Sequence, residues 1–118
     1  MNFDKFLDKK YNSKNYNCLH FVKDVYKELF EIDIENVFRG LFDGPGCRKP
    51  SVVGLEQLSR LERPISPCIA LFQANRRSPH VGIWLGGRIL HLSTNGAEWT
   101  PLESFMLDFN KVRFYNVK

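Results

Sequence analysis

Apolar side chains recur every three or four residues in the segment CLHFVKDVYKELF, residues 18–30. That spacing gives a helix one apolar face and one polar face. Asn17 stands just before the segment, where a side-chain oxygen can accept hydrogen bonds from the first free backbone N–H groups. The pattern therefore predicts a helix that begins at Cys18. Its apolar face carries Cys18, Phe21, Val22, Val25 and Leu29.

A second stretch with helical spacing follows a region without a clear pattern. Residues 31–50 contain the turn sequence DGPG and predict no regular element. Apolar side chains then recur three residues apart, which predicts a second helix that ends before Pro64. The side chains that carry this spacing are Leu55, Leu58 and Leu61.

The second half of the chain changes to strand patterns. Gly86-Gly87 separates two apolar runs and favours a two-residue hairpin turn. Residues 94–110 predict a loop with a short helical turn at LESFM. Helical segments followed by strands predict an α+β fold, with N-terminal helices packed on a small antiparallel sheet. The predicted strands are CIALFQ (68–73), HVGIWL (80–85), RILHLS (88–93) and KVRFYNV (111–117).

Length and composition fit a single domain over residues 1–118. A chain of 118 residues can fold without disulfides or metal, and an apolar share of 43% excludes disorder. The net charge is +4 and no nucleic-acid-binding motif is present, so we expect no nucleic-acid partner. No apolar run is long enough to cross a bilayer, and the charged start MNFDKFLDKK is unlike a signal peptide. We therefore expect synthesis in the cytoplasm and no membrane insertion.

The three cysteines, Cys18, Cys47 and Cys68, do not suggest a disulfide framework or a metal site. Their number is odd, no C-x-x-C pair occurs, and Cys18 and His20 stand too close together for a usual zinc site. We therefore expect no metal and no cofactor. A thiol in the first turn of a helix has a lowered pKa, so Cys18 is a candidate nucleophile. Its alternative role is that of a small apolar residue in the core.

The predicted hairpin supplies a candidate base for that thiol. With a two-residue loop, Leu85 opposes Arg88, and the register carries His80 and His91 to one face as diagonal neighbours within side-chain reach. Gly82 between them would leave open space. One imidazole can take up a thiol proton while the other holds it in the required tautomer. Together with the cysteine, the two histidines favour a catalytic role over that of half-exposed strand residues.

These segments resemble the NlpC/P60 family of cysteine peptidases, and more narrowly its phage-tail and gene-transfer-agent branch. NYNCLHFVKDVY resembles the nucleophile segment, PCIALF the strand before the histidine hairpin, and HVGIWLGGRILHLS the hairpin itself. The segments occur in family order over residues 16–93. The chain departs from the family at Leu19-His20, where Ser-Gly is common, and at Cys68-Ile69, where Gly-Asp is common.

The resemblance implies a papain-like fold with Cys18 as nucleophile, His80 as base and His91 as the orienting residue. It implies hydrolysis of peptide bonds in bacterial peptidoglycan through a thioester, with stem peptides as substrate. Phage tail proteins are the partners it suggests, and the periplasm or cell wall is the place of action, reached as part of a virion or a secreted assembly. An oxyanion or substrate site would draw on Tyr11, Tyr16 and Asn17.

Two further interpretations stay open at this point. Asn-Cys-x-His-Phe-Val and the His-x-Gly-Ile-x-Leu-Gly hairpin also resemble the lecithin retinol acyltransferase-like group, which implies a thioester-forming acyltransferase or deamidase. In that group the hairpin precedes the cysteine, whereas here the cysteine comes first. The contrasting class is a non-catalytic structural tail protein on the same fold.

Overall fold

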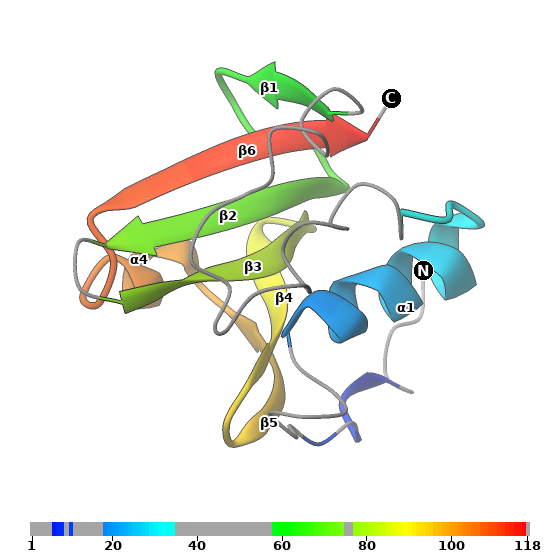
Figure 1. Cartoon of the computed structure of the whole chain (residues 1–118), viewed down its shortest axis with the longest axis horizontal. Coiled ribbons are helices and arrows are strands. Elements are labelled where there is room, and N and C mark those ends of the chain that lie inside the picture. Colours follow the sequence, from blue (N-terminus) through cyan, green and yellow to red (C-terminus); the bar gives the residue numbers. More distant parts are fainter. Residues whose placement is uncertain (1–5, 9, 11–17, 35–57, 75–76, 118) are drawn as a thin grey trace.

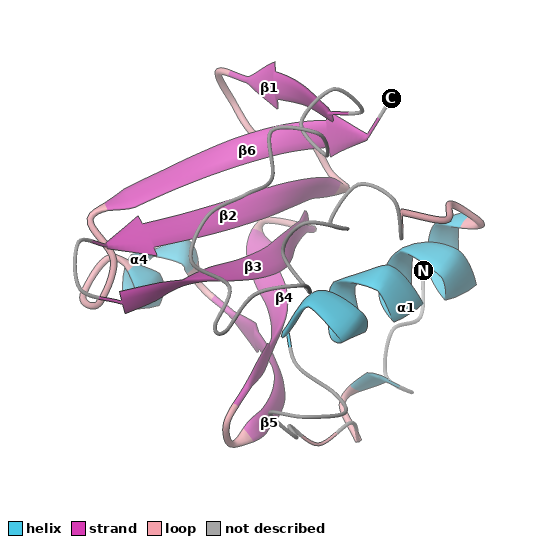
Figure 2. Cartoon of the chain, viewed as in Figure 1, coloured by secondary structure: helices cyan, strands magenta, loops and turns pink. Residues whose placement is uncertain are grey.

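One antiparallel sheet organises the part of the chain that the computed structural model describes, namely residues 6–8, 10, 18–34, 58–74 and 77–117. The strand order is β1-β6-β2-β3-β4-β5, and each neighbouring pair is antiparallel. Two helices accompany the six strands in these residues, which confirms the predicted α+β class (Figure 2). The elements are α1 (Cys18–Phe30), β1 (Leu58–Leu61), β2 (Cys68–Ala74), β3 (Arg77–Leu85), β4 (Arg88–Ser93), β5 (Gly96–Thr100), α4 (Leu102–Phe105) and β6 (Lys111–Val117).

Helix α1 begins at Cys18, as the apolar spacing predicts. Its buried face is wider than the predicted stripe, because Leu19 and Tyr26 are also buried, while Leu29 is only partly covered. The helix packs against β3 and β4. No helix in the described part of the chain is long and apolar enough to cross a membrane. The predicted cap, Asn17, lies outside the described residues.

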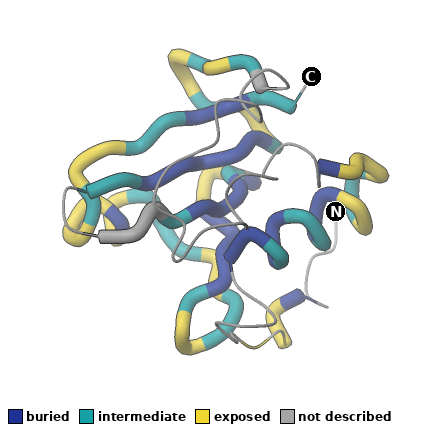
Figure 3. The backbone as a smooth tube through the Cα atoms, in the orientation of Figure 1, coloured by how far each residue is buried: buried dark blue, intermediate teal, exposed yellow. Residues whose placement is uncertain are grey.

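The sheet is covered on both faces, because alternate residues of each strand point to opposite sides. Figure 1 shows α1 on one side of the sheet and α4 on the other, and Figure 3 shows the buried stretches of the central strands between them. The face under α1 is built from Ile69, Leu71, Val81, Ile83, Leu85, Leu90, Leu92 and Tyr115. On the face under α4, Phe105 of the helix packs with Cys68, Ala70, Phe72, Ile89 and Phe114 of the sheet.

The β3–β4 hairpin has the predicted two-residue loop. Leu85 opposes Arg88, and the pairing continues away from the turn to Ile83 opposite Leu90. Gly86 and Gly87 have φ values of 61° and 88°. A tight hairpin turn of this length favours positive φ at both central residues, and glycine adopts it without steric cost. The turn chemistry thus fixes the register that determines which side chains share a face.

The predicted second helix is wrong at its C-terminal end. Leu58–Leu61 form strand β1, which pairs with β6 so that Leu58 faces Val117 and Leu61 faces Phe114. Pairing with β6 satisfies the backbone N–H and C=O groups of this segment, and this tertiary partner overrides the helical spacing of the leucines. Residues 51–57, which include Leu55, lie outside the described residues.

The segment predicted as a loop with one helical turn also contains a strand. The turn at LESFM is confirmed as α4, but Gly96–Thr100 form β5, an edge strand that pairs with β4. Asn95-Gly96 is a turn signal, and Gly96 has a φ of 115°. The short GAEWT segment that follows carries little apolar alternation, which is why its pattern did not predict a strand.

Candidate active site

His80 and His91 form a direct imidazole pair on the sheet. His80 Nε2 lies 3.0 Å from His91 Nδ1, within hydrogen-bond distance. The two rings meet edge to face, with centroids 5.1 Å apart. Their contact agrees with the hairpin register, because its continuation beyond the pair Ile83 and Leu90 carries them to one face as diagonal neighbours. The prediction that these two side chains share a face and reach each other is confirmed.

A third polar side chain continues this pair onto the next strand. His91 Nε2 lies 3.3 Å from Thr100 Oγ1. Thr100 opposes Ile89 in the β4–β5 register, so it is the diagonal neighbour of His91 on the same face. Sequence patterns did not predict Thr100 as a site residue, because residues 94–110 have the pattern of a loop. The turn signal at Asn95-Gly96 is the feature that could have found it.

Aromatic rings from β2, from α4 and from the connection after α4 cover the imidazole pair. Phe72 of β2 opposes His80, with ring centroids 6.4 Å apart. Phe105 of α4 stacks on Phe72 at 4.3 Å and meets the edge of His91 at 4.6 Å. Phe105 and Phe109 also lie nearly parallel to the His80 ring, at 6.0 and 6.2 Å. As a result His91 is only 6% exposed, while His80 remains partly accessible.

Burial keeps both imidazoles neutral at pH 7. It lowers the pKa of His80 to about 3, and the neighbouring His91 lowers it further in the same direction. Burial alone lowers the pKa of His91 to about 4. No described carboxylate opposes either shift. A neutral imidazole offers one N–H donor and one acceptor nitrogen. Each ring can therefore donate one hydrogen bond and accept another in the series His80, His91 and Thr100.

Gly82 does not leave the open space that the sequence analysis predicted. A Cβ atom at this position would lie 2.7 Å from Ile89 Cγ2 and 3.1 Å from His91 Cβ. The isoleucine methyl and the histidine stem already fill the volume beside the glycine. The close approach of these groups therefore depends on glycine at position 82.

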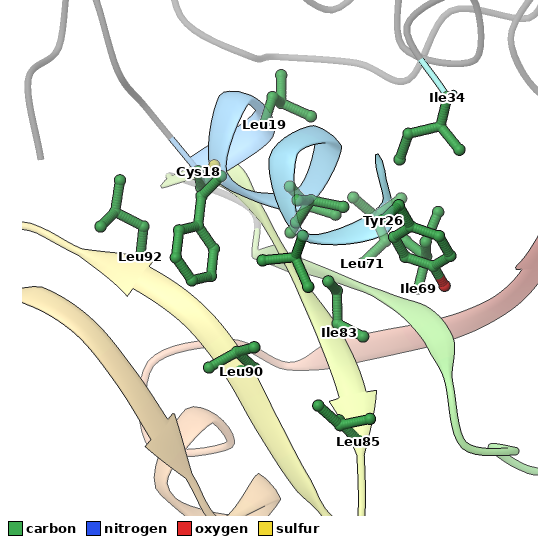
Figure 4. Packing of buried hydrophobic residues seen from close by; sticks show 14 of the residues in the cluster. Cys18, Leu19, Tyr26, Ile34, Ile69, Leu71, Ile83, Leu85, Leu90 and Leu92 are labelled. Atoms are coloured by element: carbon green, nitrogen blue, oxygen red, sulfur yellow. The ribbon is translucent and has the colours of Figure 1, made fainter. Parts of the chain in front are cut away.

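Cys18 lies on the other side of the sheet from the imidazole pair. It is 8% exposed and belongs to the apolar cluster under α1, on the side where Val81 and Leu92 point. Figure 4 shows Cys18 at the start of α1, on the same side as Leu90 and Leu92. The structure thus brings His80 and His91 together and does not bring Cys18 to them.

Other candidate groups do not replace this thiol. Cys68 shares the imidazole face, but it opposes Trp84 at the far end of β2, is fully buried, and has a pKa raised by burial. A buried thiol of that kind is a poor nucleophile. Within the described residues, no three His, Cys, Asp or Glu side chains gather as a metal site. Tyr11, Tyr16, Asn17 and Cys47 lie outside the described residues.

No protein-family model matches the chain, and no curated protein sequence matches it. The resemblance to the NlpC/P60 family therefore rests on the segments of this sequence alone and remains a prediction.

Proposed function

We propose that this protein is an amide hydrolase that cleaves peptide bonds in bacterial cell-wall peptidoglycan, with His80 as its general base. The observation that supports the proposal is the 3.0 Å contact between His80 and His91. A general base needs one ring nitrogen free for the reacting proton and the other held by a fixed partner, and this pair has that form. The substrate class comes from the resemblance of the three sequence segments.

Cys18 is the nucleophile of this proposal. His80 would take the thiol proton, and the thiolate sulfur would attack the amide carbon. The C–N bond then breaks, the amine leaves with that proton, and a thioester remains on Cys18. Water attacks the thioester, which releases the carboxylate and restores the thiol. The first step requires the Cys18 sulfur within hydrogen-bond reach of His80.

The described arrangement separates these two residues by the sheet, so the pairing of thiol and imidazole is the part of the proposal that needs the sharpest test. We would alkylate the folded protein with limiting iodoacetamide from pH 5 to 9 and follow each cysteine by peptide mass spectrometry. Cys47 and Cys68 are internal controls. His80→Ala removes the proposed base, and His20→Ala removes an imidazole from α1 itself.

We expect Cys18 to be alkylated well below pH 8 and to lose at least about tenfold in rate in His80→Ala but not in His20→Ala, since the thiolate is the reactive form. The Cys18→Ala variant should then fail to release peptides from purified peptidoglycan. An alkylation rate at Cys18 that is the same with and without His80 would overturn the proposed pair.

The second candidate is a non-catalytic structural protein, and one observation favours it. Cys18 and His91 are both buried, on opposite covered faces of the sheet. In that case the thiol and the imidazole pair are parts of two cores, and neither needs access to a substrate. Unchanged assembly or biological effect in Cys18→Ala would support this candidate. Acyl transfer uses the same nucleophile with a different acceptor, and no contact within the described residues favours it.

A further inference from the structure

We propose that Thr100 is a positioning residue that accepts a hydrogen bond from His91 Nε2–H and thereby leaves His80 Nδ1 unprotonated. The inference rests on the proposed role of His80 as a general base. Thr100 lies on β5, a strand that sequence patterns did not predict, and its role determines the direction of each hydrogen bond between the three side chains.

The three side chains form a line across three neighbouring strands. His80 of β3 contacts His91 of β4 through Nε2 and Nδ1 at 3.0 Å, and His91 contacts Thr100 of β5 through Nε2 and Oγ1 at 3.3 Å. Each contact joins diagonal neighbours on one face, so the pleat of the sheet sets both distances. Within the described residues, Thr100 Oγ1 is the side-chain partner of His91 Nε2.

Because each neutral imidazole carries one N–H, the direction of one hydrogen bond determines the other. If Thr100 Oγ1 accepts, His91 carries its proton on Nε2, its Nδ1 accepts from His80 Nε2–H, and His80 Nδ1 keeps a lone pair. If the Thr100 hydroxyl donates instead, both rings switch tautomer, and His80 Nδ1 carries the proton. A general base acting through Nδ1 requires the first arrangement.

Burial favours the neutral form of both imidazoles, which these tautomers require. It lowers the pKa of both imidazoles, so neither ring gains a second proton near pH 7. Glu98 opposes His91 directly in the β4–β5 register, but its side chain is exposed. Thr100 is therefore the group that the geometry places at the outer end of the pair.

The direct test is a nitrogen-15 NMR spectrum of the imidazoles in the full chain at pH 7.5. The chain has three histidines, so His20 on α1 provides a reference ring. In the wild type we expect His80 and His91 both as Nε2–H tautomers. Thr100→Val removes the acceptor and should move a measurable part of His80 to the Nδ1–H tautomer. Thr100→Ser keeps a hydroxyl and should restore the wild-type spectrum, which packing alone would not explain.

Hydrolysis provides a second readout on peptidoglycan fragments. Loss of one positioning hydrogen bond should lower kcat about 3- to 10-fold in Thr100→Val, with KM unchanged and kcat recovered in Thr100→Ser. A wild-type His80 that carries its proton on Nδ1, or a tautomer that Thr100→Val leaves unchanged, would overturn the inference. The expected tautomer shifts without any detectable hydrolysis would instead overturn the proposed function and leave the positioning role of Thr100 standing.

Discussion

The two faces of the sheet differ in what covers them and in what they bury. The face under α1 is packed with aliphatic and aromatic side chains beneath a 13-residue helix, and Cys18 belongs to it. The other face has a four-residue helix, α4, and combines three phenylalanine rings with the pair His80–His91. One face is therefore an ordinary apolar core, whereas the other holds hydrogen-bonded polar groups inside an aromatic cover.

This difference shows why the thiol and the imidazoles are apart. The face under α1 is mostly aliphatic, and an imidazole buried among aliphatic side chains would cost free energy for want of a hydrogen-bond partner. A hydroxyl buried in this cluster, that of Tyr26, has no hydrogen-bond partner among the described residues. On the opposite face each histidine has a partner within 3.3 Å. The same strand alternation that supplies α1 with an apolar surface sends the histidines to the other side.

The largest expected effect comes from the core under α1. Phe21 is fully buried and meets Phe6 edge to face at 6.1 Å. Phe21→Ala should lower the free energy of unfolding by about 3–5 kcal/mol, because it removes a large side chain and leaves a cavity. Urea denaturation measures the loss. Leu107→Ala, at a side chain that is 88% exposed, is the control and should change it by less than about 0.5 kcal/mol. A loss in Phe21→Ala no larger than in the control would mean that α1 does not hold this core.

The imidazole face should respond to acid. Both histidines have a lowered pKa in the folded state, so below pH 6.5 the unfolded chain binds more protons than the folded chain. The free energy of unfolding should therefore have its full value above pH 6.5 and decrease as the pH is lowered towards about 4. The slope is about 1.4 kcal/mol per pH unit for each proton of difference. Urea titrations at several pH values measure it.

Two variants assign this slope to the imidazole pair. The double variant His80→Phe/His91→Phe should flatten the pH dependence between 4.5 and 6.5. His20→Ala should change it less, since the pKa of His20 is lowered in the same direction, by burial and by Lys23, but the side chain is more exposed. Equal slopes in the wild type and the double variant would show that the pair does not remain neutral in the folded protein.

Gly82→Ala tests the packing between the strands of the hairpin. Its Cβ would approach Ile89 Cγ2 to 2.7 Å, so the variant should lose about 1–3 kcal/mol in the free energy of unfolding. The same substitution presses on His91 Cβ and should also move the imidazole resonances. Gly87→Ala is the matched control, because a Cβ there meets nothing within 4 Å but the φ of 88° disfavours alanine. Unchanged imidazole resonances in Gly82→Ala would mean that this contact does not position His91.

Sequence patterns predicted the elements whose local signals are strong. The apolar spacing of α1 and the Gly86-Gly87 turn are sufficient for the helix start and the hairpin register, and the register in turn predicts the contact of His80 with His91. These features depend on neighbours in sequence, which is why one sequence is enough to find them.

Two strands were missed for different reasons. Leu58–Leu61 become a strand because β6, distant in sequence, pairs with them. The partner of β5 is the preceding strand β4, and β5 was missed because its GAEWT segment carries little apolar alternation. The sequence patterns did indicate where Cys18 lies. The apolar face of its helix includes Cys18, and such a face packs on the apolar face of a sheet. Combining these two amphipathic patterns would have placed Cys18 opposite the histidines, whereas the family resemblance led to the contrary expectation of a thiol beside His80.

The smallest expected effect concerns two neighbours on β5 that point to opposite faces. Trp99 opposes Leu90, its indole N–H donates to the Leu85 carbonyl oxygen at 2.9 Å, and its ring lies 5.3 Å from the Arg88 guanidinium. Trp99→Phe removes that hydrogen bond and should cost about 0.5–1.5 kcal/mol in the free energy of unfolding. It should leave the tautomers of His80 and His91 unchanged, although Thr100→Val at the next position changes them. If Trp99→Phe moves the imidazole resonances as Thr100→Val does, the two faces are coupled through the edge strand. A change on the face that holds Cys18 would then affect the imidazole pair, although the sheet lies between them.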